Sequence, residues 1–274
     1  MSVATGQDFL VADVIREHLD ASITANLQTL SVAAKLPSTN QALLDAPILP
    51  GALWVCLAEH QTAGRGRRGR RWVAPPRSGL CLSIGYRFVT PPADLAALTL
   101  AMGVRAADVL RRAGADEVQL KWPNDLTWRG RKLGGILTEL KSDAQKAPTV
   151  VVGLGVNLTL PPEGLMLQGP QANPPVDLTS ICEVLPRPSI LAADLVNAMG
   201  TALQNYGDTG FEPFRVSFAA LDVLNGQAVE VAIAGDKLQG VADGITEDGL
   251  LKVRTQAGDI TVMAGDVVLL RPAN

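Results

Sequence analysis

The chain has 274 residues, a formal net charge of −3 and 47% hydrophobic residues, enough for one sizeable core and a small second domain. The charged fraction of 19% argues against a disordered chain, and no apolar run reaches the roughly 18 residues that a membrane helix needs. The N-terminal stretch carries acidic residues where a signal peptide would have basic and then apolar ones. We therefore expect a soluble, cytoplasmic protein.

Apolar periodicity predicts the elements of the first third of the chain. Residues 8–20 carry a helical stripe, and a less regular stretch follows to Pro37. A short helix is expected in STNQALLD (residues 38–45), with Ser38 or Thr39 as its N-cap. ALWVCLAEH (52–60) is predicted to be a buried strand, and LCLSIGYRF (80–88) a second strand with alternating apolar residues.

The middle of the chain predicts one long helix and a group of strands. Residues 91–114 have prolines before an apolar stripe and a glycine at the end, as is typical of a helix. Strands are expected at Val118–Trp122, Leu133–Lys141 and Thr149–Leu158, with a tight turn at Arg129–Gly130. The proline-rich segment 161–177 is predicted to be a long loop, and such loops are often functional lids. Helical stretches are expected at about 188–206 and 211–221.

From Leu224 onward the sequence changes to short alternating segments. Turn signals recur at Asn225-Gly226, Gly235-Asp236, Asp248-Gly249 and Gly258-Asp259. This spacing predicts a small β-barrel of about fifty residues. The predicted fold class is thus α+β, with a mixed β-sheet and helices followed by a small barrel of the SH3 type.

The segment GRGRRGRRW (residues 64–72) places five arginines in nine residues of a slightly acidic chain. Its glycines let backbone N–H groups turn toward a ligand, and its arginines offer forked donors suited to phosphate or carboxylate. A nucleic-acid contact would need interleaved aromatic residues and a wider basic face than Trp72 alone provides. On spacing alone, a small-anion loop, a solvated basic loop and a nucleic-acid contact all remain open.

The motif KWPNDL (residues 121–126) places three polar side chains after a strand end. A cation, an amide and a carboxylate, from Lys121, Asn124 and Asp125, can serve a phosphate chain with its metal. The same residues also fit a simple turn with an Asx cap. The motif by itself does not decide between these two interpretations.

Two strand segments contain glycines and a polar residue. In RKLGGILTEL (131–140), Lys132 enters an apolar strand and needs an anionic partner or solvent, and Gly134-Gly135 is typical of close approach by a ligand. In VVVGLGVNL (150–158), glycines interrupt the strand where a flat ligand could lie against the backbone, and Asn157 follows. The cysteines and the two histidines are too few and scattered to predict disulfides or a zinc site.

In this order, the motifs STNQ, AEHQTAGRGRRGRRW, KWPNDL, KLGGIL and VVGLGVNL resemble the signature set of the biotin protein ligases (biotin–[acetyl-CoA-carboxylase] ligases). The motifs span about residues 36–160, and the C-terminal segment extends the resemblance at lower specificity. The resemblance implies a class II synthetase-like biotin/lipoate ligase core. It also implies an N-terminal helical extension (1–36), a catalytic biotin- and ATP-binding domain (37–222) and a C-terminal small β-barrel domain (223–274).

The resemblance further implies roles for individual residues. Lys132 and Arg67 are expected to act in catalysis. Lys121, Asn124 and Asn157 match positions near ATP and its Mg²⁺, and whether Asp125 touches the metal is left open. The residues expected to bind biotin are Ser38, Thr39, Asn40, Gln61, Arg65, Gly66, Arg67 and Lys132.

The implied reaction has two steps and needs no nucleophile from the enzyme. The carboxylate of biotin attacks the α-phosphate of ATP to give biotinyl-5′-AMP and pyrophosphate, and a lysine of the biotin carboxyl carrier protein then takes the biotin and releases AMP. Because carboxylate and phosphate repel each other, Arg65, Arg67 and Lys132 are suited to bring them together. Closure of the glycine-hinged arginine loop would exclude water from the reactive anhydride.

Two features depart from the family pattern. Only 37 residues precede Ser38, too few for the N-terminal winged helix-turn-helix of some members, so we expect the short form without a DNA-binding role. The candidate adenine lid contains Leu165, Met166 and Leu167 but no tryptophan, which is common there in relatives. The contacts that cover the adenine are therefore not assigned.

Other functions are weighed against this one. A lipoate ligase or acyl transferase would share the core architecture, but the GRGRRGR loop favours biotin. A nucleic-acid-binding regulator would use the arginine loop, and its affinity would fall steeply with salt. A biotin-binding module without catalysis is disfavoured by the intact KWPND motif and by Lys132. An exposed sheet edge could pair two subunits as a homodimer or dock the carrier protein, and no membrane partner is expected.

Overall fold

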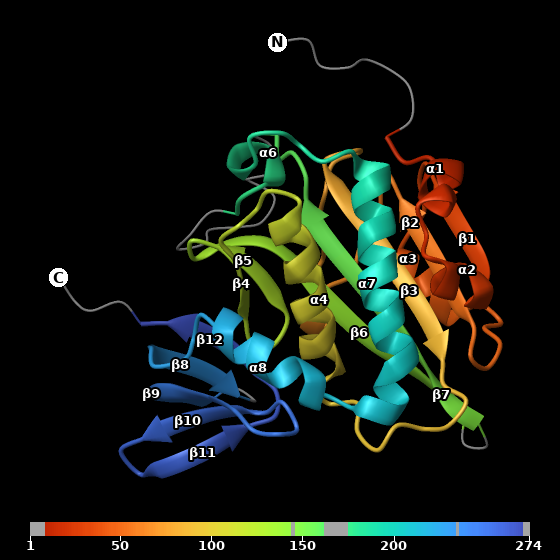
Figure 1. Cartoon of the computed structure of the whole chain (residues 1–274). Helices are drawn as coiled ribbons and strands as arrows, with labels where there is room; N and C mark the ends of the chain where they lie inside the picture. The colour runs from red at the N-terminus through yellow and green to blue at the C-terminus, as the bar shows by residue number, and fades with distance from the viewer. Residues whose placement is uncertain (1–8, 144–145, 162–174, 234–235, 271–274) are drawn as a thin grey trace.

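The computed structural model describes residues 9–143, 146–161, 175–233 and 236–270. A seven-stranded sheet lies beside a smaller five-stranded sheet near the C-terminus, and helices pack on the larger one (Figure 1). The predicted α+β class, with a mixed sheet and helices and a small C-terminal β domain, is confirmed. Among the described helices, none is both long enough and apolar enough to cross a membrane.

The large sheet has the strand order β1-β2-β3-β7-β6-β5-β4. Its first pair, β1 and β2, is parallel, and each further pair is antiparallel. The strands are β1 (Leu27–Ala33), β2 (Leu53–Ala58), β3 (Gly79–Arg87), β4 (Val118–Lys121), β5 (Asp125–Trp128), β6 (Arg131–Asp143) and β7 (Lys146–Asn157).

Side-chain alternation along β7 gives the large sheet two different faces. Val150, Val152 and Leu154 join the main core, which also contains buried residues of the long helices α4 and α7 that cross the sheet (Figure 1). Val151, between them, packs instead with Leu43 of α3. The helices are α1 (Ala12–Glu17), α2 (Ala21–Asn26), α3 (Thr39–Leu44), α4 (Leu98–Arg112), α6 (Leu178–Ile181), α7 (Pro188–Thr209) and α8 (Glu212–Leu221), with a 3₁₀ turn η1 (Arg67–Gly69) in the arginine loop.

Several elements differ from the sequence predictions, among them β1, β5 and the start of α4. The segment 1–36, expected to be a helical extension, contains β1, which pairs with β2 and so belongs to the large sheet. β1 was missed because all but one of its residues are partly exposed, so no clear alternation is visible in its sequence. β5 was not predicted because it has only four residues next to the tight turn at Arg129–Gly130, where both residues have positive φ. The helix predicted over 91–114 begins only at Leu98.

The C-terminal sheet is antiparallel, with the order β11-β10-β9-β8-β12. Among the residues described, its edge strands β11 and β12 do not pair, so the predicted SH3-type domain is an open sheet rather than a closed barrel. Trp122 Nε1 donates to Gly249 O at 3.0 Å and ties the two sheets together. The strands are β8 (Ala228–Ile233), β9 (Asp236–Ile245), β10 (Leu251–Thr255), β11 (Gly258–Val262) and β12 (Asp266–Leu269).

Candidate active site

A cavity of about 870 Å³ is enclosed by the large sheet, the start of α3, the arginine loop and β12. Its lining contains ten of the eleven residues predicted for the site, although they come from four separate motifs. These are Ser38, Thr39, Asn40, Gln61, Arg65, Gly66, Arg67, Lys121, Asn124 and Lys132. The lining also includes residues outside the motifs, among them Asp266 and Val268.

One end of the cavity is a network of neutral polar side chains around the first turn of α3. Ser38 caps this helix, as predicted, because its Oγ accepts from the backbone N–H of Gln41. Thr39 donates to Gln61 Oε1 through its backbone N at 2.8 Å and its hydroxyl at 3.1 Å. The fully buried Ser83 hydroxyl lies 2.7 Å from Thr39 Oγ1 and 2.6 Å from Asn40 Oδ1. These bonds fix the side chains in place before any ligand arrives.

Gly153 and Gly155 of β7 line the cavity, and they also make room for side chains of the chain itself. A Cβ on Gly153 would lie 2.1 Å from Asn40 Oδ1, and a Cβ on Gly155 would lie 2.6 Å from the Trp72 ring. Neither position can therefore hold a larger residue without moving Asn40 or Trp72. The two glycines do not interrupt β7, which runs continuously through them.

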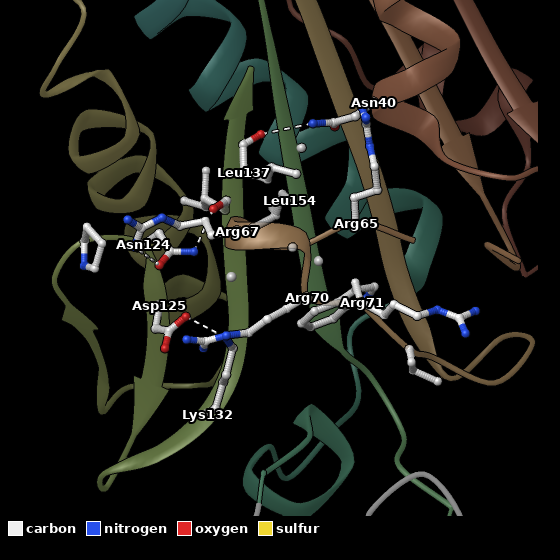
Figure 2. Close-up of a pocket in the computed structure, with 18 of the residues that line it drawn as sticks. Asn40, Arg65, Arg67, Arg70, Arg71, Asn124, Asp125, Lys132, Leu137 and Leu154 are labelled. Carbon is white, nitrogen blue, oxygen red and sulfur yellow. Dashed lines mark hydrogen bonds and ion pairs between the residues drawn. The ribbon is translucent and has the colours of Figure 1, made fainter. Parts of the chain in front are cut away.

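The other end of the cavity is rich in charge. Lys132 on β6 donates to Asp125 Oδ1 at 2.6 Å, and Arg67 donates to Asn124 Oδ1 at 3.3 Å (Figure 2). The predicted need of Lys132 for an anionic partner is thus met by Asp125 of the neighbouring strand. Burial lowers the pKa of Lys121, and the nearby Asp125 opposes this shift.

The arginine loop is held by carboxylates on two sides. Arg65 Nη2 lies 2.8 Å from Glu139 Oε2, and Arg68 Nη1 lies 3.2 Å from Asp266 Oδ2, which also accepts from Arg70. Arg68 has φ +53°, a left-handed conformation that costs a non-glycine residue free energy and so needs support from its surroundings. Burial lowers the pKa of Arg67, with the Asp266 charge acting in the opposite direction.

Asn157 is the one predicted site residue that does not line the cavity. Its side-chain amide is buried at the end of β7 and donates to Val176 O at 3.0 Å and to Lys132 O at 3.4 Å. Its Oδ1 has no partner among the described residues. The Asn157 side chain therefore holds the backbone at Lys132 in place through hydrogen bonds. The predicted adenine lid, Leu165 to Leu167, lies outside the described residues.

The fold and the cavity belong to one class of enzymes. The model of the Biotin/lipoate A/B protein ligase family matches residues 32–157, which contain β2 to β7 and the cavity motifs. The model of the Biotin protein ligase C terminal domain matches residues 225–270, the five-stranded sheet. The first match thus corresponds to the seven-stranded sheet and the second to the five-stranded sheet.

Comparison with individual proteins shows which members of this enzyme class the chain is similar to. The chain is 36% identical to the "Bifunctional ligase/repressor BirA" of Salmonella typhimurium over 96% of this chain and 79% of the relative. It is 35% identical to the "Biotin--[acetyl-CoA-carboxylase] ligase" of Mycobacterium tuberculosis over 88% of this chain and 89% of the relative. The structure of the biotin protein ligase of Aquifex aeolicus in complex with biotin and ATP matches with a TM-score of 0.71 at 25% identity, covering 90% and 99% of the two chains. The chain belongs to the biotin protein ligase family and is an ATP-dependent biotin ligase.

Proposed function

We propose that the neutral end of the cavity binds the ring of biotin and that the charged end binds the carboxylate of biotin with the α-phosphate of ATP. The observation that carries this assignment is the polarity of the cavity. Ser38, Thr39, Asn40 and Gln61 lie at one end, and Lys121, Lys132 and Arg67 lie at the other. A ligand with a neutral polar ring and an anionic tail matches that arrangement.

The charged end is suited to the first step, the formation of biotinyl-5′-AMP with release of pyrophosphate. Two anions must meet there, and Lys132 and Arg67 reduce their repulsion and stabilise the charge that develops on the α-phosphate. Lys132 must exchange Asp125 for the substrate, since the two are paired in this structure. Arg65 and Gly66 complete the biotin side of the loop, and the closed loop keeps water from the mixed anhydride.

We propose Mg²⁺ as the cofactor that accompanies ATP. The described residues contain no group of three or more histidine, cysteine or acidic side chains able to hold a metal by themselves. Mg²⁺ needs no such group, because it keeps several waters and binds through one or two protein oxygens together with substrate phosphates. Asp125 and Asn124, which both line the cavity, fit this limited role. When bound, Mg²⁺ would neutralise phosphate charge.

We propose the biotin carboxyl carrier protein of acetyl-CoA carboxylase, or of a related carboxylase, as the acceptor. Its lysine would attack the acyl carbon of biotinyl-5′-AMP and release AMP, so no enzyme nucleophile is needed. The name of the relative from Mycobacterium tuberculosis gives acetyl-CoA carboxylase as the protein that receives biotin. Pairing of two subunits, the lack of a DNA-binding role, the domain boundaries and a cytoplasmic location stay predictions.

The experiment that tests the site assignment is exchange of labelled pyrophosphate into ATP with Mg²⁺ and without acceptor protein. Exchange that requires biotin and fails with lipoate is the expected result. Exchange with lipoate alone would assign the cavity to the lipoate ligases. Binding of biotin without exchange would leave a binding module and remove the proposed role of Lys132.

A further inference from the structure

Glu139 on β6 connects two residues of the cavity lining, Asn40 and Arg65, and it was not singled out from the sequence. A single oxygen, Oε2, accepts from Asn40 Nδ2 and from Arg65 Nη2, each at 2.8 Å. The side chain is one-quarter exposed and stands outside the cavity lining. Glu139 therefore reaches a substrate only through Asn40 and Arg65, both of which line the cavity (Figure 2).

The first consequence concerns the orientation of the Asn40 amide. Its NH₂ group donates to Glu139 and, at 3.1 Å, to Leu137 O, so both groups facing that side are acceptors. The Asn40 oxygen must then face the Ser83 hydroxyl, which connects onward to Thr39. A flipped amide would place its carbonyl oxygen against a carboxylate and a carbonyl. The Glu139 charge thus sets the donor–acceptor sense of the neutral network.

The second consequence concerns the Arg65 guanidinium. Glu139 holds one end of it through Nη2, while Nε is buried and has no partner among the described residues. A buried N–H without an acceptor is unfavourable, and an oxygen of a bound anion would satisfy it. The Glu139 carboxylate accepts from two donors on the same oxygen. Its charge is therefore largely compensated within the protein and opposes an incoming anion only weakly.

We infer that Glu139 is a positioning residue for biotin. It fixes the Asn40 amide that meets a neutral ring and the Arg65 guanidinium that meets an anionic tail, and so sets the separation between these two recognition points. This inference rests on the proposed placement of biotin in the cavity. The ligand it selects is a cyclic urea with a carboxylate at a fixed distance, and the nucleotide is outside its reach.

The test compares Glu139→Gln with a matched control, Glu230→Gln. Glu230 on β8 also accepts from a cation and an amide, Lys237 at 2.7 Å and Gln239 at 2.9 Å, but lies in the C-terminal sheet and outside the cavity lining. Glutamine keeps the shape of Glu139 but loses its charge, so it holds the Asn40 amide and the Arg65 guanidinium more weakly. In pyrophosphate exchange, Glu139→Gln should raise the KM for biotin about tenfold, with kcat and the KM for ATP changed less than about twofold. Glu230→Gln should match the wild type.

A double-variant cycle separates positioning from general destabilisation. If Glu139 acts partly through Asn40, the double variant Asn40→Ala/Glu139→Gln will raise the biotin KM by a factor well below the product of the factors for the two single variants. Glu139→Asp, which keeps the charge on a shorter stem, should restore part of the biotin affinity. The inference is overturned if Glu139→Gln leaves the biotin KM unchanged, if kcat alone falls, or if the two effects multiply fully. A wild-type protein that exchanges pyrophosphate with lipoate alone would overturn the proposed function and this inference together.

Discussion

The polar side chains at the two ends of the cavity find their hydrogen-bond and ion-pair partners in different ways. At the neutral end, Thr39, Asn40, Gln61 and Ser83 are held by hydrogen bonds within the chain, to one another and, for Asn40, also to Glu139. At the charged end, Lys132 is paired with Asp125, and this pair must open when an anion binds. The neutral end is therefore ready for its ligand before binding, whereas the charged end exchanges an internal partner for the substrate.

Because of this difference, we expect the two ends of the cavity to affect different kinetic constants. Groups that are already in place hold the substrate equally in the ground state and in the transition state, and their loss raises KM. Cations that meet charge as it develops act mainly on the transition state, and their loss lowers kcat. Variants at the two ends should separate along these lines.

The largest effect is expected at the charged end. Lys132→Ala and Arg67→Ala should each slow formation of biotinyl-5′-AMP by about a hundredfold or more, because each removes a cation from the developing phosphate charge. Single-turnover formation of the adenylate measures this directly. Lys237→Ala, which removes an exposed ion-paired lysine from the C-terminal sheet, is the control and should leave the rate unchanged. Wild-type rates in both cavity variants would contradict the assignment.

A smaller effect is expected at the neutral end. Gly153→Ala places a methyl group where Asn40 Oδ1 now lies, so the amide and its bond to Ser83 must shift. The KM for biotin should rise about tenfold or more, with a smaller change in kcat. Gly207→Ala is the matched control, because its Cβ would lie 3.5 Å from Phe88, an ordinary contact. If Gly153→Ala lowered kcat but left the biotin KM unchanged, the separation of the two ends would fail.

A third effect tests whether Asp266 of the C-terminal sheet supports the charged end of the cavity. Asp266→Asn keeps the shape of the side chain but removes the charge that holds Arg68 and Arg70. We expect the KM for ATP to rise a few-fold, about 1 kcal/mol, because these pairs are partly exposed. Trypsin should also cut the arginine loop faster in the variant. Asp243→Asn, which breaks an exposed pair with Arg254 in the same sheet, should change neither measurement.

Some residues of the site could be predicted from the sequence and others could not. The cavity residues were predictable because glycine and charge in unusual places, such as Lys132 in an apolar strand, leave a local signal. Glu139 and Asp266 leave none, since a glutamate on a strand and an aspartate after a turn are ordinary on a solvated face. Their importance comes from partners 74 and 198 residues away along the chain. β1 was missed for a related reason, because its place is fixed by pairing with β2 and not by its own pattern.

The smallest effect on the reaction is expected at Asp222, which lies at the joint between α8 and the C-terminal sheet and outside the cavity lining. Burial raises the pKa of Asp222 to about 6, although its Oδ1 accepts from the backbone N–H of Leu224. Because the folded-state pKa lies above the unfolded value, the protonated carboxyl favours folding. Its contribution is complete below about pH 4 and is lost as the pH rises through about 6.

Asp222→Asn should therefore stabilise the protein only at higher pH. Asparagine can keep the acceptor for Leu224 N but cannot ionise, so the variant avoids the cost of a buried charge. Urea unfolding should show the variant more stable than the wild type by up to about 3 kcal/mol near pH 8, with the difference vanishing near pH 4. The KM values for biotin and ATP should stay at wild-type levels at every pH. A difference in stability that is the same at both pH values would mean that Asp222 acts through its shape or hydrogen bond and not through its charge.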